Sequence, residues 1–189
     1  KLRDVADQLP GEALVCPADL AEPSSFRKVM QQIEHAWGGI DVLVNNAVWY
    51  EEQAFLDVTP DEWDERVNVN LRGPFFLTQA AVPYMLAEDG GDVITIAAAD
   101  VLKPVAKGHL TEYAASKSGL IGFMRALRHK YEPHGIRFSV ISPGWIYKGE
   151  EAGRHPKQVH AEEVARTVLF LASLSPGHVI REIALETPG

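Results

Sequence analysis

Short apolar runs rich in β-branched residues alternate with longer stretches of helical periodicity, and this alternation limits the possible folds more than any other feature. The run IDVLVNN at residues 40–46 has three successive apolar residues, VLV at 42–44, before its two asparagines, which is typical of a strand in a sheet that helices cover on both faces. Successive parallel strands need crossover connections, and helices usually supply them. The sequence therefore predicts an α/β fold with a doubly wound parallel sheet.

The expected elements follow one another along the whole chain. The predicted strands cover residues 13–18, 40–46, 91–98, 135–143 and 179–186. The predicted helices cover residues 23–37, 59–88, 111–133 and 161–174. The sequence contains no internal repeat and no low-complexity tract, and its length is sufficient for one sizeable core. We therefore expect residues 1–189 to form a single domain.

The charge pattern limits the possible partners. The net charge is -8 and the basic residues are scattered, which argues against nucleic acid or an anionic membrane as the main partner. No apolar stretch approaches the ~20 residues of a membrane span. The single cysteine, Cys16, excludes an internal disulfide framework and suits a reducing compartment. We expect a cytoplasmic protein that acts on a small molecule and has no metal site.

Tyr113 and Lys117, in the stretch YAASK, are the first candidates for chemistry. Their i, i+4 spacing places both side chains on one face of a helix. An ammonium close to a phenol favours the phenolate, so we expect Lys117 to lower the pKa of Tyr113 from about 10 towards the range of a general acid or base. In isolation this spacing is common, and a solvent-facing pair on an ordinary helix is the more frequent explanation.

Six motifs in order along the chain resemble the short-chain dehydrogenase/reductase (SDR) superfamily. They are DL at 19–20, IDVLVNNA at 40–47, VNVNLRGPF at 67–75, YAASKSGLIGF at 113–123, GIRFSVISPG at 135–144 and VLFLAS at 168–173. The resemblance implies a Rossmann-type sheet that binds NAD or NADP. It also implies hydride transfer between the nicotinamide and a carbonyl or alcohol substrate.

The resemblance assigns catalytic roles to three residues. Tyr113 would be the acid/base, and Lys117 would lower its pKa and hold the nicotinamide ribose. Asn70 would support the active-site helix and a water that links to Lys117 in a proton relay. A polar mid-helix residue that forms only local hydrogen bonds is the alternative for Asn70.

The rest of the cofactor site follows from the same resemblance. It comprises Asp19, Leu20, Asn45, Asn46, Ala47, Pro143, Gly144 and Ile146. Asp19 would contact adenine, the backbone of 45–47 would pack beside the adenosine half, and the last three residues would line the nicotinamide. Asp19 as a simple helix cap and Pro143-Gly144 as a simple turn are the alternatives.

The sequence departs from the family pattern at three places. The first strand and the glycine-rich TGxxxGIG turn are not in it, so we expect the N-terminal βαβ portion, with its phosphate site, to be absent from this chain. The family's active-site serine is replaced by Ala98 or a neighbour at 97–99, and Thr111, His109 or a water is a possible substitute. Lys148 stands in place of a cofactor-contacting threonine, ahead of a short substrate lid at 148–158.

Two hypotheses for the function follow. The first is an NAD(P)-dependent oxidoreductase with an atypical carbonyl-polarising group, and the second is a catalytically impaired or non-redox SDR-like binding or partner protein. Trp49, Tyr50 and Trp145 either line an aromatic substrate pocket or serve only in packing. The helical regions 59–88 and 111–133 are more apolar than one buried stripe requires, so we expect a homodimer or homotetramer.

Overall fold

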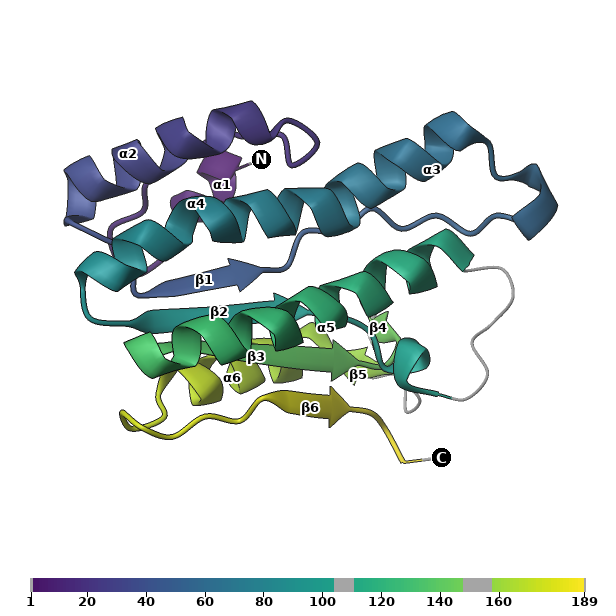
Figure 1. Cartoon of the computed structure of the whole chain (residues 1–189). Helices are drawn as coiled ribbons and strands as arrows, with labels where there is room; N and C mark the ends of the chain where they lie inside the picture. Colours follow the sequence, from purple (N-terminus) through teal and green to yellow (C-terminus); the bar gives the residue numbers. More distant parts are fainter. Residues whose placement is uncertain (1, 104–110, 148–157, 189) are drawn as a thin grey trace.

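The computed structural model describes residues 2–103, 111–147 and 158–188. Within these residues, four parallel strands form the main sheet in the order β1-β2-β3-β6 (Figure 1). Their bounds are β1 (Val42–Asn45), β2 (Gly91–Ile96), β3 (Ile136–Pro143) and β6 (Glu182–Leu185). A short parallel pair, β4 (Ile146–Tyr147) and β5 (Val159–His160), follows the carboxyl end of β3. The predicted parallel α/β architecture is confirmed.

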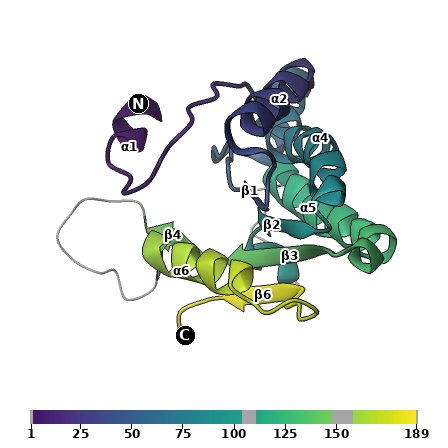
Figure 2. The same cartoon turned by 90° about the vertical axis from the view of Figure 1, so that its left-hand side faces the viewer.

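Helices cover both faces of the sheet, as Figure 2 shows when the strands are seen nearly end-on. The helices α2 (Phe26–Trp37), α4 (Gly73–Ala87) and α5 (Thr111–Tyr131) lie on one face, and α6 (Ala161–Ala172) lies on the other. The remaining helices are α1 (Leu2–Ala6) and α3 (Pro60–Val67). Short 3₁₀ turns occur at η1 (Pro23–Ser25), η2 (Phe55–Asp57), η4 (Ala99–Leu102) and η5 (Glu132–His134).

Two apolar cores result from the alternation of side chains along the strands. Val93 of β2 packs with Met85 of α4 and Met124 of α5 on one face of the sheet. Its neighbour Ile94 packs with Leu171 of α6 on the other face. Because successive strand side chains point to opposite faces, a strand covered on both sides must be apolar throughout. This explains the continuous apolar runs in the sequence.

The predicted strand at residues 13–18 is wrong. In the structure these residues form no strand, and the chain between α1 and α2 runs away from the sheet (Figure 2). A strand is stabilised by the hydrogen bonds of a neighbouring strand, and β1 is the edge strand of the sheet in the described part of the chain. Residues 13–18 have the composition of a strand, but they pair with none of the strands in the described part of the chain.

The predicted helix at 59–88 is interrupted by a π-helical segment, η3 (Asn68–Arg72). Thr59 and Glu62 form a capping box at the start of α3, with Pro60 in the first turn. The segment ends where the Gly73 N–H donates to the carbonyl of Asn68, five residues back. The next residue, Pro74, has no N–H for the ordinary α-helical bond, which favours such a local π bulge.

Candidate active site

A cleft with a volume of about 780 Å3 lies at the carboxyl ends of the first three strands. This is the edge at which parallel α/β sheets bind ligands. Its lining residues are Val44, Asn46, Val48, Ile96, Ala97, Tyr113, Lys117, Ile146, Ala161, Val164, Ala165, Val168 and Leu169. The strand ends and α6 form its apolar walls, and α5 contributes its tyrosine and lysine.

Lys117 is almost completely buried, with an exposed fraction of 2%. Its Nζ donates to the carbonyl oxygen of Ile96, the last residue of β2, at 2.9 Å. The same Nζ lies 5.7 Å from the centroid of the Tyr113 ring. The lysine therefore joins the start of α5 to the end of β2, and both side chains face the cleft as their spacing predicts.

The pKa values of the pair differ from the expectation. Burial raises the pKa of Tyr113 to about 12, and the charge of Asp100 adds to this rise. Burial lowers the pKa of Lys117 to about 8. Loss of hydration disfavours the charged form of each group, which for a phenol means a higher pKa and for an amine a lower one. The predicted lowering of the Tyr113 pKa is therefore wrong for the unliganded protein.

Replacing Lys117 with methionine is expected to stabilise the protein by about 2 kcal/mol at pH 7. Relief of the burial cost contributes about 3 kcal/mol, and loss of the bond to Ile96 removes about 1 kcal/mol. Between pH 8 and about 10.5 the unfolded state binds more protons than the folded state. The stability of the wild type therefore rises with pH across this window, and the advantage of the variant falls.

Urea unfolding of wild type and Lys117→Met at several pH values measures this effect. Lys28→Met is the matched control, because Lys28 is exposed and its replacement should change stability by less than about 0.5 kcal/mol. A Lys117→Met variant that is less stable than wild type at pH 7 would contradict the burial cost.

Asn70 is buried in the π-helical segment and holds the loop that follows β1. Its Oδ1 accepts from the backbone N–H of Trp49 at 2.7 Å, and its Nδ2 donates to the Trp49 carbonyl at 2.8 Å. The side-chain oxygen and nitrogen of Asn70 thus both bind the backbone of one residue, Trp49. π-Helical segments are frequent at functional sites. Asn70 therefore supports the loop after β1, while its predicted support of the active-site helix and its water link to Lys117 stay predictions.

The predicted adenosine-side residues are divided between the cleft and its surroundings. Asn46 lines the cleft, and Ala47 is exposed in the loop after β1. Asn45 is buried, and its Nδ2 donates to the hydroxyls of Thr78 and Thr95 at 3.1 and 3.3 Å. This bond pattern gives Asn45 a structural role between β1, α4 and β2.

Asp19 and Leu20 lie outside the lining of the cleft. Asp19 accepts from the backbone N–H of Ala21 at 2.9 Å, which is a local turn bond and not a helix cap, because Glu22 is the residue that precedes η1. The backbone of Leu20 packs against Gly73, where an added Cβ would come within 2.6 Å of the Leu20 carbonyl oxygen. A glycine at this position is therefore required for the close approach of the 19–21 segment to α4.

The third group of predicted residues follows β3. Ile146 lines the cleft, whereas Pro143 is paired with Leu185 of β6. The Gly144 N–H donates to the Leu185 carbonyl at 2.8 Å, so this amide extends the sheet. The structure therefore brings Tyr113, Lys117, Asn46 and Ile146 together around the cleft, and it places the other predicted residues behind or beside it.

The three alanines at 97–99 are buried at the end of β2 and carry no hydroxyl. The hydroxyl of Thr111, one of the proposed substitutes, lies 3.1 Å from Oε2 of Glu112, to which it donates. Ser116 donates to the backbone carbonyl of Tyr113 at 2.8 Å. The other positions considered, His109 and Lys148, lie outside the described residues, as does most of the lid region.

A buried ion pair beside Tyr113 was not apparent from the sequence. Nη1 of Arg66 donates to Oε1 of Glu112 at 2.5 Å, and the two residues are 3% and 1% exposed. Nη2 of Arg66 also donates to Oε1 of Gln53 at 2.6 Å. Glu112 directly precedes Tyr113, so this pair fixes the first turn of α5 against α3. Nothing in the local pattern around Arg66 distinguishes it from the charged surface residues of α3.

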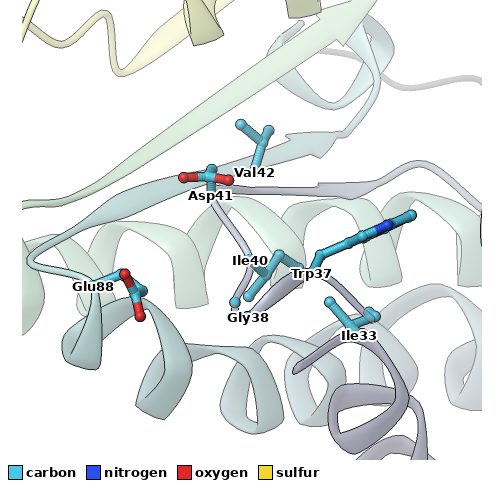
Figure 3. Close-up of a pocket in the computed structure, with 8 residues that line it drawn as sticks. Ile33, Trp37, Gly38, Ile40, Asp41, Val42 and Glu88 are labelled. Carbon is cyan, nitrogen blue, oxygen red and sulfur yellow. The ribbon is translucent and has the colours of Figure 1, made fainter. Parts of the chain in front are cut away.

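A second depression of about 650 Å3 lies at the amino end of β1, and its lining includes Trp37, Ile33, Asp41 and Glu88 (Figure 3). It contains two carboxylates but neither a tyrosine nor a lysine.

Among the described residues, no three histidine, cysteine or acidic side chains are placed to hold a metal ion. None of the described helices is both long and apolar enough to cross a membrane. The chemistry-bearing groups are gathered at the first cleft.

Comparison with known proteins agrees with this geometry. The family model for short chain dehydrogenases matches residues 1–157. The chain is 30% identical to the 3-oxoacyl-(acyl-carrier-protein) reductase FabG of Thermotoga maritima, over 94% of this chain and 77% of that protein. It is also 30% identical to an uncharacterized oxidoreductase of Staphylococcus aureus, over 98% of this chain and 81% of the relative.

Two solved structures have the same fold. A metagenomic short-chain oxidoreductase in complex with NADP superimposes with a TM-score of 0.81 at 29% identity, covering 99% of this chain and 79% of that one. A short-chain type dehydrogenase/reductase from Mycobacterium marinum gives a TM-score of 0.86 at 28% identity, covering 98% and 80%. The predicted superfamily is confirmed: this chain belongs to the short-chain dehydrogenases, a family of oxidoreductases.

Proposed function

We propose that this protein is an NAD(P)-dependent carbonyl reductase in which Tyr113 is the acid/base. The observation that carries the proposal is the placement of Tyr113 beside the buried Lys117 in a cleft at the carboxyl ends of the strands. The cleft walls are apolar and open: Leu169 is 70% exposed. An exposed apolar surface of this kind is typical of a ligand site.

The residues around the cleft fit the nicotinamide half of the cofactor. An ammonium carries three N–H donors, and the Ile96 carbonyl takes one of those on Lys117. The remaining two suit the hydroxyls of a ribose. Ile146 and Ala97 offer apolar surface to a flat ring. The NADP complex of the metagenomic relative supports the same cofactor class here.

When bound, a reduced nicotinamide supplies a hydride, which carries two electrons to the carbonyl carbon. The Tyr113 hydroxyl donates the proton that the carbonyl oxygen needs to become an alcohol, and solvent then reprotonates the tyrosine. Because its pKa is raised to about 12, Tyr113 is fully protonated at neutral pH and is in the form that donates.

Titration of the protein's tryptophan fluorescence with NADPH and with NADH tests cofactor binding. We expect saturable quenching by at least one of them, because Trp145 directly precedes Ile146, which lines the cleft. The Lys117→Met variant should bind about tenfold more weakly, since it loses charge-assisted hydrogen bonds. Lys28→Met should bind like the wild type. Absence of any saturable change with both cofactors would refute the proposal.

A second candidate function is a cofactor-binding protein without turnover. The hydroxyl-free residues 97–99 favour it, because carbonyl reduction benefits from more than one hydrogen-bond donor to the developing oxyanion. Cofactor binding combined with no reduction of any carbonyl compound would support this candidate over the first.

A further inference from the structure

We propose that the hydroxyl of Tyr50 binds the substrate's carbonyl oxygen beside Tyr113 and supplies the second donor that residues 97–99 lack. This inference rests on the proposed function. Hydride addition to a carbonyl places negative charge on its oxygen, and each preorganised donor at that oxygen stabilises the transition state. Tyr113 provides one donor. The question is which side chain of this chain provides the other.

Tyr50 lies directly against Tyr113. Their ring centroids are 5.3 Å apart and the rings are perpendicular, at 89°. On its other side, Tyr50 contacts Trp145 in a second perpendicular arrangement, with centroids 5.8 Å apart. Tyr50 is 38% exposed, so its ring is accessible from solvent beside Tyr113, although it lies outside the lining of the cleft. The three aromatic side chains come from the loop after β1, the start of α5 and the turn after β3.

The loop that carries Tyr50 is fixed on both sides. Asn70 binds both backbone groups of Trp49, the preceding residue, at 2.7 and 2.8 Å. Arg66 binds Gln53 at 2.6 Å and Glu51 at 3.4 Å, just after Tyr50. Asn70 and Arg66 are themselves buried. Two buried side chains thus hold an exposed loop, which is the preorganisation that a catalytic donor requires.

The Tyr50 hydroxyl is available as a donor at neutral pH. Burial and its bond to Glu52 raise its pKa to about 12, so it carries its proton. It donates to Oε1 of Glu52 at 2.9 Å, and this bond is exposed to solvent. Release of the hydroxyl from Glu52 to a substrate oxygen exchanges one exposed acceptor for another.

The other hydroxyl groups near Tyr113 form hydrogen bonds within the protein. Thr95 is fully buried, with its hydroxyl 3.4 Å from the Met124 sulfur. Ser116 donates to the Tyr113 carbonyl, and Thr111 donates to Glu112. Among the described residues, Tyr50 is therefore the hydroxyl that combines contact with the Tyr113 ring and access from solvent.

The test is steady-state reduction of benzaldehyde and of ethyl acetoacetate with NADPH and with NADH, comparing wild type with Tyr50→Phe. This substitution keeps the ring and its two aromatic contacts and removes only the hydroxyl. We expect kcat to fall about 10²-fold, with KM and the cofactor Kd changed less than about threefold. Tyr131→Phe likewise removes one hydroxyl, but from a ring that packs against Phe138 away from the cleft, and we expect it to keep the wild-type kcat.

A rescue variant separates the chemical role from a structural one. Ala98→Ser, introduced into Tyr50→Phe, places a hydroxyl at the end of β2, and we expect it to recover at least about tenfold of the lost kcat. If Tyr50→Phe keeps more than half of the wild-type kcat while Tyr113→Phe is inactive, Tyr50 is not the second donor. The proposed function, with Tyr113 as the acid/base, then still stands. A wild-type protein that binds neither cofactor overturns the proposed function and this inference with it.

Discussion

Replacing Tyr113 with phenylalanine is expected to lower kcat for carbonyl reduction by about 10³-fold, the largest effect of any single substitution in the site. The variant removes the proton donor and nothing else. Its ring can keep the perpendicular contact with Tyr50, and Lys117 keeps its bond to Ile96. The free energy of unfolding and the cofactor Kd should therefore change little, which distinguishes lost chemistry from lost structure.

Assays of NADPH consumption measure kcat, a cofactor titration measures the cofactor Kd, and a thermal melt shows any change in stability. Tyr131→Phe is the matched control, because Tyr131 ends the same helix and its ring packs against Phe138 away from the cleft. We expect this control to keep the wild-type kcat. A Tyr113→Phe variant with more than a tenth of the wild-type kcat would show that another group donates the proton.

Replacing Arg66 with methionine is expected to destabilise the protein by about 3–5 kcal/mol. The substitution leaves the Glu112 carboxylate buried without its cation, and an uncompensated buried charge is costly. A loss of this size is a large fraction of the stability of a typical domain. Because the loop carrying Tyr50 also loses its anchor at Gln53, we expect kcat to fall even under conditions in which the variant is folded.

The double variant Arg66→Met/Glu112→Leu separates the charge from the packing. It removes both ions, so we expect it to recover most of the free energy of unfolding that the single variant loses. Urea unfolding of the wild type, Arg66→Met, Glu112→Leu and the double variant gives the coupling energy. A single Arg66→Met variant within about 1 kcal/mol of the wild type would contradict a tight buried pair.

The sheet could be predicted because the residue pattern of each strand shows which of its two faces are buried. Val93 and Ile94 of β2 enter opposite cores, so apolar residues occupy successive positions, and Phe138 and Ile141 of β3 likewise lie in opposite cores. Residues 13–18 have the same composition but no neighbouring strand. Strand formation depends on a partner distant in sequence, and composition alone does not contain that information.

In the candidate site too, contacts between residues close in sequence could be predicted, and contacts between distant residues could not. Tyr113 and Lys117 are one helical turn apart, so their spacing already places them on one face. Arg66 and Glu112 are 46 residues apart, and only the packing of α3 on α5 joins them. The pKa of Tyr113 was predicted in the wrong direction because burial, a property of the tertiary structure, raises it, and the charge of Asp100 adds to this rise.

The wall formed by α6 was also missed. Val164 and Leu171 face the core, as an amphipathic helix predicts, but Ala165 and Leu169 are exposed and apolar. An apolar arc wider than the buried stripe was the available signal, because Leu169 and Ala165 turn out to line the cleft.

Transfer of deuterium tests hydride transfer most directly. NADPH or NADH deuterated at the transferring position of the nicotinamide is incubated with the protein and benzaldehyde, and the product is analysed by mass spectrometry. We expect benzyl alcohol with one deuterium on the former carbonyl carbon from the wild type, and almost none from Tyr113→Phe. Cofactor binding without labelled alcohol from any carbonyl tested would contradict the proposed reductase and favour the binding protein.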